Sequence, residues 1–382
     1  MPLTNEYIYK NQTDIKEFEE DINIFECSNC GLVQNPINLD YEGYYRDYDY
    51  TTGHSTFAQN FFDLYAEIAI NFYTQENGFK PKSVLEIGSG DGCQLSKFID
   101  KNVIDVTGVE GSKVLVDNAN SNGIKTIHSL FNVDFINNNA KKYDICLSSY
   151  TFDHASDPRE YLRLAHYALN ENGILAIEIH NLDEIIKRTE YCLFEHEHTI
   201  YLTPNDAKRF LELNGFTVLS LDPIDQKSVR ANSLIIIAKK VQDTSKIVSN
   251  EDMGLISHSN KNLDTLNFRI NKTIENIESW IDNIPPEIPL VGFGAGGRGT
   301  MTLAALSNYS RFSAVLDSNY QSGIYALPKT RIDMIGPDEW SDYSDSMCLV
   351  LSYGYFDEIK ATLINKGFLP ERIHSLKDLY EY

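Results

Sequence analysis

The 382-residue sequence lacks any apolar run approaching the roughly 20 residues that a membrane-spanning helix needs. Residues 1–21 also lack the apolar core of a secretory signal, because charged side chains are scattered through them. These absences predict a soluble, cytoplasmic protein. Hydrophobic residues still make up 42% of the chain, so large cores can form, and the length predicts two or three compact units.

Cysteine is scarce as well. The chain has six cysteines, and only Cys27 and Cys30 form a close pair. Nothing in this spacing suggests a disulfide framework of the kind found in small secreted domains.

Basic residues are outnumbered by acidic ones, 33 against 55, which gives a formal net charge of −22. A field of that sign opposes binding to nucleic acid and to anionic membranes, so neither is expected as a partner. A small anionic substrate remains compatible with the sequence, because local arginines and helix N-termini can bind phosphate.

Three stretches of different character follow one another along the chain. Residues 1–55 are polar and tyrosine-rich and predict a small, loop-rich cap. Residues 56–240 begin with an amphipathic helix expected over 56–72 and continue as alternating strands and helices. Residues 241–382 begin with a polar linker and a long helix up to Ile281, and then predict a second α/β domain.

The middle stretch predicts a doubly wound α/β fold with a parallel sheet covered on both faces. Strands are expected at 83–87, 106–109, 143–148, 174–179, 216–221 and 234–238. Helices are expected at 93–99, 113–119, 157–169 and 204–213. Asn172 and Gly173 are expected to close the third of these helices.

A glycine-rich turn after the first of these strands carries the strongest chemical signal. Glycines at 88, 90 and 92 permit positive φ angles and bring backbone N–H groups close to a ligand. Glu86 can hold the amino group of an amino-acid-bearing ligand, and Glu110, at the end of the next strand, can accept bonds from both ribose hydroxyls. The pattern favours S-adenosylmethionine; the alternatives are a nicotinamide dinucleotide and a purely structural turn.

Further cofactor contacts are expected around the same sheet edge, because open α/β folds bind ligands at the carboxyl ends of their strands. The complete set of expected cofactor-binding residues is Glu86, Gly88, Ser89, Gly90, Asp91, Gly92, Glu110, Gly111, Phe131 and Ser149.

A second cluster of chemical groups lies in the segment Glu195-His196-Glu197-His198. One interpretation makes a histidine a general base oriented by a neighbouring carboxylate, since imidazole titrates near neutral pH. A metal site formed by His196 and His198 is a second interpretation, and a plain polar loop is a third.

In the C-terminal stretch, residues 294–299 form a glycine loop that opens a helix after a strand. Such a loop can bind phosphate through its backbone N–H groups, and Arg298 can add charge. A packing turn explains the glycines equally well.

The order of these motifs resembles that of the sugar C-methyltransferases that act on nucleotide-linked keto-deoxysugars, over nearly the whole chain. The segments that carry the resemblance are Cys27–Gln34, Tyr48–Thr52, Leu85–Gly92, Tyr150–His154, Glu195–Tyr201, Ser228–Arg230, Gly294–Thr300, Asp317, Leu327–Pro328 and Tyr353–Ile359. The resemblance implies a small zinc-binding unit, a cofactor domain and a third domain that binds a nucleotide-sugar.

The mechanism that the resemblance implies passes through an enolate. His198 matches the family's base, with Glu197 beside it, His154 as a second polar contact or acid, and Glu195 also in the catalytic set. For His154 an N-capping or loop role is the alternative. The substrate-binding residues implied are Tyr50, His196, Tyr201, Arg230, Gly294, Arg298 and Tyr353.

Departures from the family pattern concern zinc and the substrate pocket. The family has two C-x-x-C pairs, but no cysteine precedes Cys27 here. Two thiolates do not complete a tetrahedral zinc site, so either a ligand such as His54 joins Cys27 and Cys30 or the metal is lost, and we favour loss. Glu195 replaces a family Tyr and Lys227 a family Gly, which leaves O- or N-methylation as an alternative to C-methylation.

Overall fold

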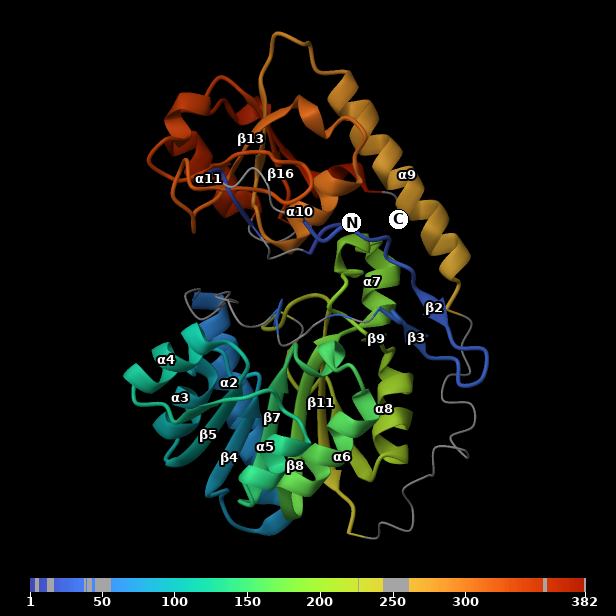
Figure 1. Cartoon of the computed structure of the whole chain (residues 1–382), viewed down its shortest axis with the longest axis vertical. Helices are drawn as coiled ribbons and strands as arrows, with labels where there is room; N and C mark the ends of the chain where they lie inside the picture. The colour runs from blue at the N-terminus through green and yellow to red at the C-terminus, as the bar shows by residue number, and fades with distance from the viewer. Residues whose placement is uncertain are drawn as a thin grey trace. The chain divides into compact units, whose positions relative to one another are not determined.

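The computed structural model describes residues 1–3, 7–11, 17–37, 39, 43–44, 56–225, 227–242, 261–352 and 356–380. The chain forms two compact units (Figure 1). Unit 1 combines Met1–Asn23, Ile185–His196 and Lys261–Tyr382, and unit 2 combines Ile24–Glu184 and Glu197–Asn260. The predicted cap over 1–55 is thus divided between the two units instead of standing alone.

Unit 2 is built on a seven-stranded sheet with the order β10-β11-β8-β7-β4-β5-β6. Its strands are β4 (Ser83–Ile87), β5 (Asp105–Glu110), β6 (Thr126–His128), β7 (Tyr143–Ser149), β8 (Leu169–His180), β10 (Phe216–Leu221) and β11 (Ser233–Lys240). The prediction of a wholly parallel sheet is wrong, because β11 pairs antiparallel with both β8 and β10. The short connection from β10 to β11 explains the difference, since it leaves no room for a crossover helix.

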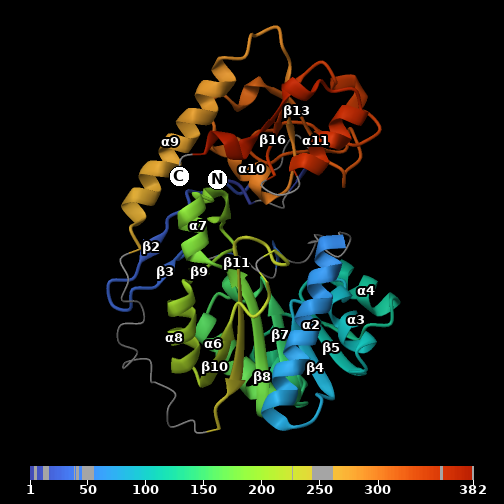
Figure 2. The same cartoon turned by 180° about the vertical axis from the view of Figure 1, so that it is seen from behind.

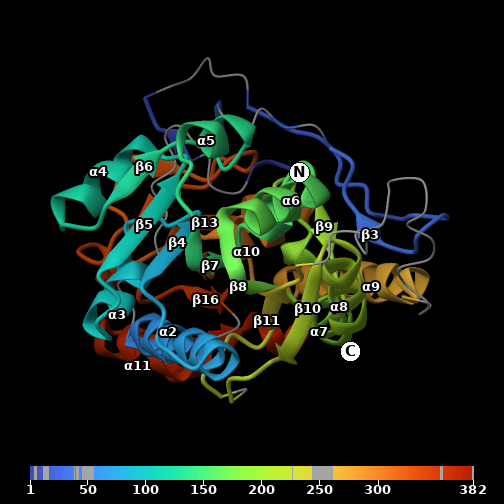
Figure 3. The same ribbon diagram turned by 90° about the horizontal axis from the view of Figure 1, so that it is seen from below.

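Helices cover both faces of this sheet, as predicted. One core packs against α2 (Thr56–Asn77), α3 (Cys93–Asp100) and α4 (Lys113–Ser121). The other core packs against α5 (Val133–Asn138), α6 (Pro158–Ala168) and α8 (Pro204–Leu213). Figure 2 shows α2 crossing in front of the sheet, and Figure 3 shows α2 and α3 on the opposite side from α5 and α6.

The start of β8 differs from the expectation. Asn172 and Gly173 do not close a helix, because α6 already ends at Ala168 and both residues lie within β8. The pairing of β7 with β8 shifts between Tyr143/Leu169 and Ile145/Ile174. Asn172, with a φ of 59°, lies in the extra stretch that this register shift creates.

A three-stranded sheet in unit 2 joins β2 (Phe25–Glu26), β3 (Val33–Gln34) and β9 (Ile200–Tyr201). Both pairings are antiparallel. This sheet attaches the Cys27–Cys30 turn to the segment that follows His198. The short helix α7 (Leu182–Arg188), which the sequence analysis did not predict, lies between β8 and that segment.

Unit 1 contains a parallel sheet with the order β15-β13-β12-β16-β17. The strands are β12 (Leu290–Phe293), β13 (Phe312–Leu316), β15 (Met334–Ile335), β16 (Met347–Val350) and β17 (Ile373–Ser375). The helices are α9 (Leu263–Asp282), α10 (Gly297–Ala305) and α11 (Phe356–Asn365), labelled in Figure 1. The second predicted α/β domain is therefore present, with β1 (Ile8–Tyr9) added to it by antiparallel pairing with β14 (Tyr325–Ala326).

No helix in the part of the chain that the structure describes is both long enough and apolar enough to cross a membrane.

Candidate active site

The turn between β4 and α3 has the backbone geometry that its glycines predicted. Gly88, Gly90 and Gly92 have φ angles of 70°, 53° and 82°. A Cβ on Gly88 would lie 2.2 Å from Thr151 Oγ1, whereas a Cβ on Gly90 would have no atom within 4 Å. The turn therefore requires glycine at 88 for packing and leaves space beside Gly90 for a ligand.

Glu110 at the end of β5 faces this turn. Its Oε2 accepts a hydrogen bond of 2.9 Å from the N–H of Gly90, and its Oε1 accepts one of 2.8 Å from the N–H of Ser112. The carboxylate is buried, so these bonds fix both the loop and the acid at the sheet edge. Each oxygen keeps a second acceptor position for a hydroxyl donor.

Glu86 in β4 is a buried carboxyl group at the same edge of the sheet. Its side chain is buried, and no described residue forms a hydrogen bond with its Oε2. Burial raises the pKa of Glu86 well above its usual range, and the nearby carboxylates of Asp91 and Glu110 raise it further. A cationic donor at this position would supply both the missing bond and the missing charge, as the ammonium group of an amino acid does.

The other expected cofactor residues lie around the same turn and the adjoining strand ends. Ser89 Oγ is buried, and no described residue forms a hydrogen bond with it, which leaves a further polar atom for a ligand. Ser149 Oγ lies near the buried side chains of Tyr65 and Glu178. Phe131 packs edge-on against Tyr161, and the carbonyl oxygen of Gly111 contacts His128 Nε2 at 3.0 Å. Asp91 accepts a bond from the N–H of Cys93 and so belongs to the helix start.

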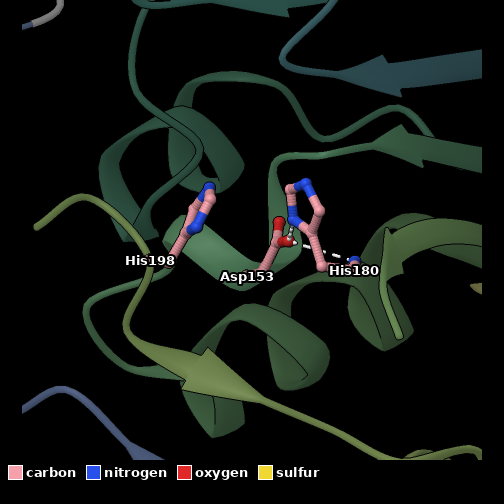
Figure 4. A group of neighbouring side chains, drawn as sticks. All are labelled: Asp153, His180 and His198. Carbon is pink, nitrogen blue, oxygen red and sulfur yellow. Dashed lines mark hydrogen bonds and ion pairs between the residues drawn. The ribbon is translucent and has the colours of Figure 1, made fainter. Parts of the chain in front are cut away.

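A cluster of histidines and carboxylates lies at the ends of β7 and β8. Asp153 and His154 lie in the 3-10 helix η1 (Phe152–His154), which follows β7, and His180 is the last residue of β8. Asp153 Oδ2 lies 2.7 Å from His180 Nδ1 (Figure 4). The imidazole centroid of His198 lies 4.7 Å from that of His180 and 4.8 Å from that of His154.

Backbone contacts explain why His198 joins this cluster. The N–H of Thr199 donates to the carbonyl oxygen of Asp153 at 2.8 Å, and Thr199 Oγ1 donates to the carbonyl oxygen of Ala155 at 2.6 Å. Tyr150, which starts the turn, has a φ of 49°, a left-handed conformation that is costly for a residue with a side chain. The turn after β7 is thus held by tertiary contacts in the position that brings Asp153 to His180.

The environments of the three imidazoles differ. Burial lowers the pKa of His198 to about 4, and the neighbouring His180 and His154 add to that effect. Burial also lowers the pKa of His154. Burial alone would raise the pKa of Asp153, but its hydrogen bond to His180 and that ring's charge outweigh burial and hold it below its usual range.

Glu197 and Tyr201 complete the surroundings of His198 within unit 2. Glu197 Oε2 lies 3.7 Å from His154 Nδ1, beyond hydrogen-bonding distance, and none of the residues that the structure describes forms a hydrogen bond with it. The Tyr201 ring is edge-on to His198 with centroids 6.1 Å apart. Of the expected catalytic residues, His198, Glu197 and His154 are therefore brought together.

Division by backbone contacts assigns Glu195 and His196 to unit 1. A carboxylate oxygen of Glu195 nevertheless lies within 4.8 Å of ligand atoms of Glu197 and His198, whereas His196 does not join the cluster. His196 Nε2 lies 3.1 Å from the carbonyl oxygen of Glu20, and its ring is edge-on to Phe18. Among the described residues, the candidate metal-ligand groups do not pair His196 with His198. His196 therefore packs within unit 1, against Phe18 and the backbone of Glu20.

The remaining expected substrate residues have the following positions. The Arg230 guanidinium lies 4.9 Å from the centre of the Tyr150 ring in unit 2. Arg298, in the first turn of α10, lies 3.4 Å from the buried carboxylate of Glu190 in unit 1. Gly294 has a φ of 102° and donates its N–H to Leu316. Tyr50 and Tyr353 lie outside the described residues, as does His54.

Cys27 and Cys30 lie together in the turn between β2 and β3 as free thiols. Hydrogen bonds from the N–H groups of Cys30 and Asn29 lower the pKa of Cys27, whereas burial raises that of Cys30. Among the described residues, two groups of side chains could hold a metal ion: Asp153 with His180 and His198, and Glu195 with Glu197 and His198. Neither group includes Cys27 or Cys30. The described chain therefore supplies no third zinc ligand here.

Two polar residues of the cluster were missed by the sequence analysis, Asp153 and His180. Asp153 precedes His154 in a loop that was already singled out, and His180 ends a predicted strand. Their positions at neighbouring strand ends were the available signal.

Residues 58–221 match the family model of the methyltransferase domain. This range contains the glycine turn, Glu86 and Glu110, on a sheet with one antiparallel strand. The chain is therefore an S-adenosylmethionine-dependent methyltransferase with a class I, Rossmann-like cofactor domain. S-adenosylmethionine is its cofactor.

Individual relatives are distant. The C-methyltransferase NovU of Streptomyces niveus is 22% identical over 287 residues, which cover 72% of this chain and 67% of NovU. The plantazolicin methyltransferase BpumL in complex with SAH is 19% identical with a TM-score of 0.40, over 48% of this chain and 85% of that chain. An S-adenosylmethionine-dependent methyltransferase from Clostridium acetobutylicum is 12% identical with a TM-score of 0.37, over 49% and 93% of the two chains.

Proposed function

We propose that this enzyme methylates a carbon atom next to a ketone in a nucleotide-linked keto-deoxysugar, and that His198 removes the proton from that carbon. Such a carbon is a poor nucleophile until it has lost a proton, so the site needs a base in addition to the methyl donor. The sugar substrate is suggested by the order of motifs in the sequence, and the carbon acceptor is supported by the likeness to the C-methyltransferase NovU.

The observation that carries the proposal is the state of His198. Its ring is buried against two other imidazoles, and its pKa is lowered to about 4. At neutral pH it is therefore uncharged and has a lone pair with which to accept a proton. The carboxylates of Asp153 and Glu197 favour the imidazolium that forms afterwards.

The residues at the end of the sheet fit the cofactor. Glu86, whose Oε2 lacks a partner, would hold the amino group, and Glu110 would accept bonds from the ribose hydroxyls. The N–H groups near Gly90 would border the amino-acid part, where a Cβ is absent. Bound there, S-adenosylmethionine supplies an electrophilic methyl group on a sulfonium.

The test is incubation with isotopically labelled S-adenosylmethionine and a panel of nucleotide-linked 4-keto-6-deoxyhexoses, with fragmentation of the products by mass spectrometry. Label on a ring carbon supports the proposal. Label on oxygen or nitrogen supports the alternative in which a sugar heteroatom is methylated, which the replacement of a family Tyr by Glu195 favours. Absence of any labelled sugar would exclude this substrate class.

Replacing His198 by Ala tests the base. We expect turnover to fall by at least about 100-fold because proton removal is lost, while affinity for the cofactor changes less than about twofold. His166→Ala is the matched control, since that histidine packs on Phe216 away from the cluster. Unchanged turnover in His198→Ala would remove the base assignment.

A further inference from the structure

The five-stranded sheet of unit 1 has the strand order of a nucleotide-binding fold. Numbered along the chain from β12, its parallel strands lie in the order 3-2-1-4-5. The sheet of unit 2, numbered from β4, begins with the same order before β11 and β10 are added. Such folds bind ligands outside the carboxyl ends of the strands, where the order reverses. In unit 1 that point lies between β12 and β16, and the loop 294–299 leaves β12 there.

Three glycines of this loop, spaced as G-x-G-x-x-G, have different surroundings. Gly294 has a φ of 102°, which requires glycine for the turn. A Cβ on Gly299 would lie 2.0 Å from the carbonyl oxygen of Gly294, which requires glycine for packing. Gly296 has a φ of −61°, which any residue adopts, and no described atom lies within 4 Å of an added Cβ. A packing turn therefore explains Gly294 and Gly299 but not Gly296, whereas a diphosphate close to the backbone explains all three.

Asp317, which directly follows β13, repeats in unit 1 the contacts of Glu110 in unit 2. Its Oδ2 accepts a hydrogen bond of 2.8 Å from the N–H of Ala295 in the loop, and its Oδ1 accepts one of 2.9 Å from the N–H of Asn319. Glu110 likewise accepts one bond from the glycine turn after β4 and one from the N–H two residues after itself. Asp317 is only 9% exposed, and each of its oxygens keeps an acceptor position for a hydroxyl.

The backbone bonds that place these two acids also correspond. In unit 2 the N–H of Gly88 donates at 2.8 Å to the carbonyl oxygen of Val109, the residue before Glu110. In unit 1 the N–H of Gly294 donates at 2.8 Å to the carbonyl oxygen of Leu316, the residue before Asp317. Each acid is thus held at the same step beside the first glycine of its turn. Because Glu110 is proposed above to accept ribose hydroxyls, Asp317 occupies the equivalent position for a second ribose.

Two tyrosine rings lie beside this loop and the end of β13. Tyr7 Oη donates to the carbonyl oxygen of Ala295 at 3.2 Å, and the Tyr7 ring is edge-on to Tyr320 with centroids 5.0 Å apart. Both rings are partly exposed, and Tyr320 comes three residues after Asp317. Aromatic rings next to a ribose site provide a flat apolar surface on which a base can pack.

We infer that unit 1 contains a second nucleotide site, which binds a ribonucleoside diphosphate. The 2′- and 3′-hydroxyls of the ribose donate to Asp317, and the diphosphate lies beside Gly296, where the first N–H groups of α10 have no partner within the helix. The diphosphate belongs either to a free dinucleotide or to the nucleotide-linked sugar, and in the second case the inference rests on the proposed function. A 2′-deoxyribose lacks one of the two donors, so the site selects ribose.

Calorimetry on the full chain, saturated with SAH so that the cofactor site is occupied, measures this selection. UDP, CDP, GDP and ADP are each compared with their 2′-deoxy counterparts. We expect at least one ribonucleotide to bind with one equivalent per chain and at least about tenfold more tightly than its deoxy form, because a buried acceptor is otherwise left unpaired. Absence of binding by all four, or equal binding of the ribo and deoxy forms, would overturn the inference.

Two further ligands identify the source of the diphosphate. Tighter binding of NAD⁺ than of ADP supports a dinucleotide as the occupant. Tighter binding of a nucleotide-linked 4-keto-6-deoxyhexose than of its free diphosphate supports the methyl acceptor as the occupant. Both results uphold the site.

Asp317→Asn tests the ribose contact. We expect it to weaken binding of the ribonucleotide by about tenfold or more while binding of the deoxy form changes far less, so that the preference for ribose is lost. A merely structural role would weaken both forms equally. Asp333→Asn is the matched control, since that exposed acid pairs with Lys10 and precedes β15, at the opposite ends of the parallel strands.

Gly296→Ser tests the diphosphate contact in a variant that should fold. Serine is a favourable residue at the start of a helix, so the melting temperature should not fall. Its side chain enters the open space and competes for the N–H groups of α10, so nucleotide affinity should fall by about tenfold or more while SAH affinity stays the same. Unchanged nucleotide affinity in this variant would exclude the loop as the diphosphate site.

The inference and the proposed function fail in different ways. If no nucleotide-linked sugar is methylated but ribonucleotides bind and Asp317→Asn removes their preference, the proposed function fails and the second site stands. If a sugar is methylated but Asp317→Asn and Gly296→Ser bind nucleotides like the unmodified protein, only the second site fails.

Discussion

Glu86 is a buried acid whose Oε2 finds no hydrogen-bond donor among the described residues. Its Oε2 lies at the end of β4 with no donor, and its pKa is raised first by burial and then by Asp91 and Glu110. A group in that state destabilises the free protein and favours a ligand that brings a positive charge. The same oxygen atom of Glu86 therefore lowers the stability of the ligand-free protein and raises its affinity for a cationic ligand.

Replacing Glu86 by Gln is expected to separate these two effects. A raised folded pKa contributes stability below the ordinary value of 4.5 and loses it as pH rises through the folded value. The melting temperature of Glu86→Gln should therefore rise relative to the unmodified protein between pH 4 and pH 8, measured without ligand. Affinity for SAH, measured by calorimetry at pH 7, should fall by about tenfold or more. A melting difference that does not change with pH would contradict the assignment.

At the scale of single residues, the sequence predicted the groups that belong to local motifs. Glu110 and His198 could be found because each stands next to a recognisable pattern. The bond between Asp153 and His180 could not, because the residues lie 27 positions apart and meet only when β7 and β8 pair. Likewise, His196 looked equivalent to His198 in the sequence, but belongs to the other unit.

At the scale of elements, the turn between β4 and α3 depends on Gly88 for two reasons, its φ of 70° and its contact with Thr151. We expect Gly88→Ala to lower the free energy of unfolding by roughly 2 to 4 kcal/mol, since left-handed strain and overpacking add. Denaturant unfolding measures this, and SAH affinity should fall as well.

Gly78 provides the matched control for that change. Its φ is 77°, but an added Cβ would have no atom within 4 Å. Gly78→Ala should therefore cost about 1 kcal/mol from backbone strain alone and leave SAH affinity unchanged. Equal losses in the two variants would show that contact with Thr151 has no effect.

Elements with strong local signals were predicted closely, and those defined by pairing were not. α8 was predicted with its observed ends, and the structure shows Thr203 capping its start and Asn214 following its last residue. β6 and α7 were missed, since a three-residue strand and a seven-residue helix carry too little periodicity. The direction of β11 was also wrong, because alternation of apolar residues does not encode whether a strand runs parallel to its neighbour.

At the scale of the whole molecule, each unit is assembled from separate stretches of chain. Unit 1 needs Met1–Asn23 and Ile185–His196 as well as the C-terminal stretch. β1 pairs with β14, Lys10 forms an ion pair of 2.6 Å with Asp333, and Arg269 donates to the carbonyl oxygen of Ile186. The sequence, read as consecutive domains, gave no sign of this.

If the chain is divided between residues 250 and 251, we therefore expect the C-terminal fragment to stay bound to the N-terminal fragment. Fragments 1–250 and 251–382, produced together, should co-elute in gel filtration, because unit 1 contains strands and helices from both. Ile8→Asp, which places a charge at a buried position of β1, should weaken that association. Separate elution of the unaltered fragments would contradict this account of unit 1.

The shared construction of unit 1 also dictates an order of events during synthesis on the ribosome. Residues 1–23 are translated before the rest of unit 1, and β14, with which β1 pairs, follows more than 300 residues later. All of unit 2 has by then left the ribosome and can fold. β1 must consequently wait, unpaired, until β14 has been translated, so the cofactor domain can fold while the rest of unit 1 is still being made.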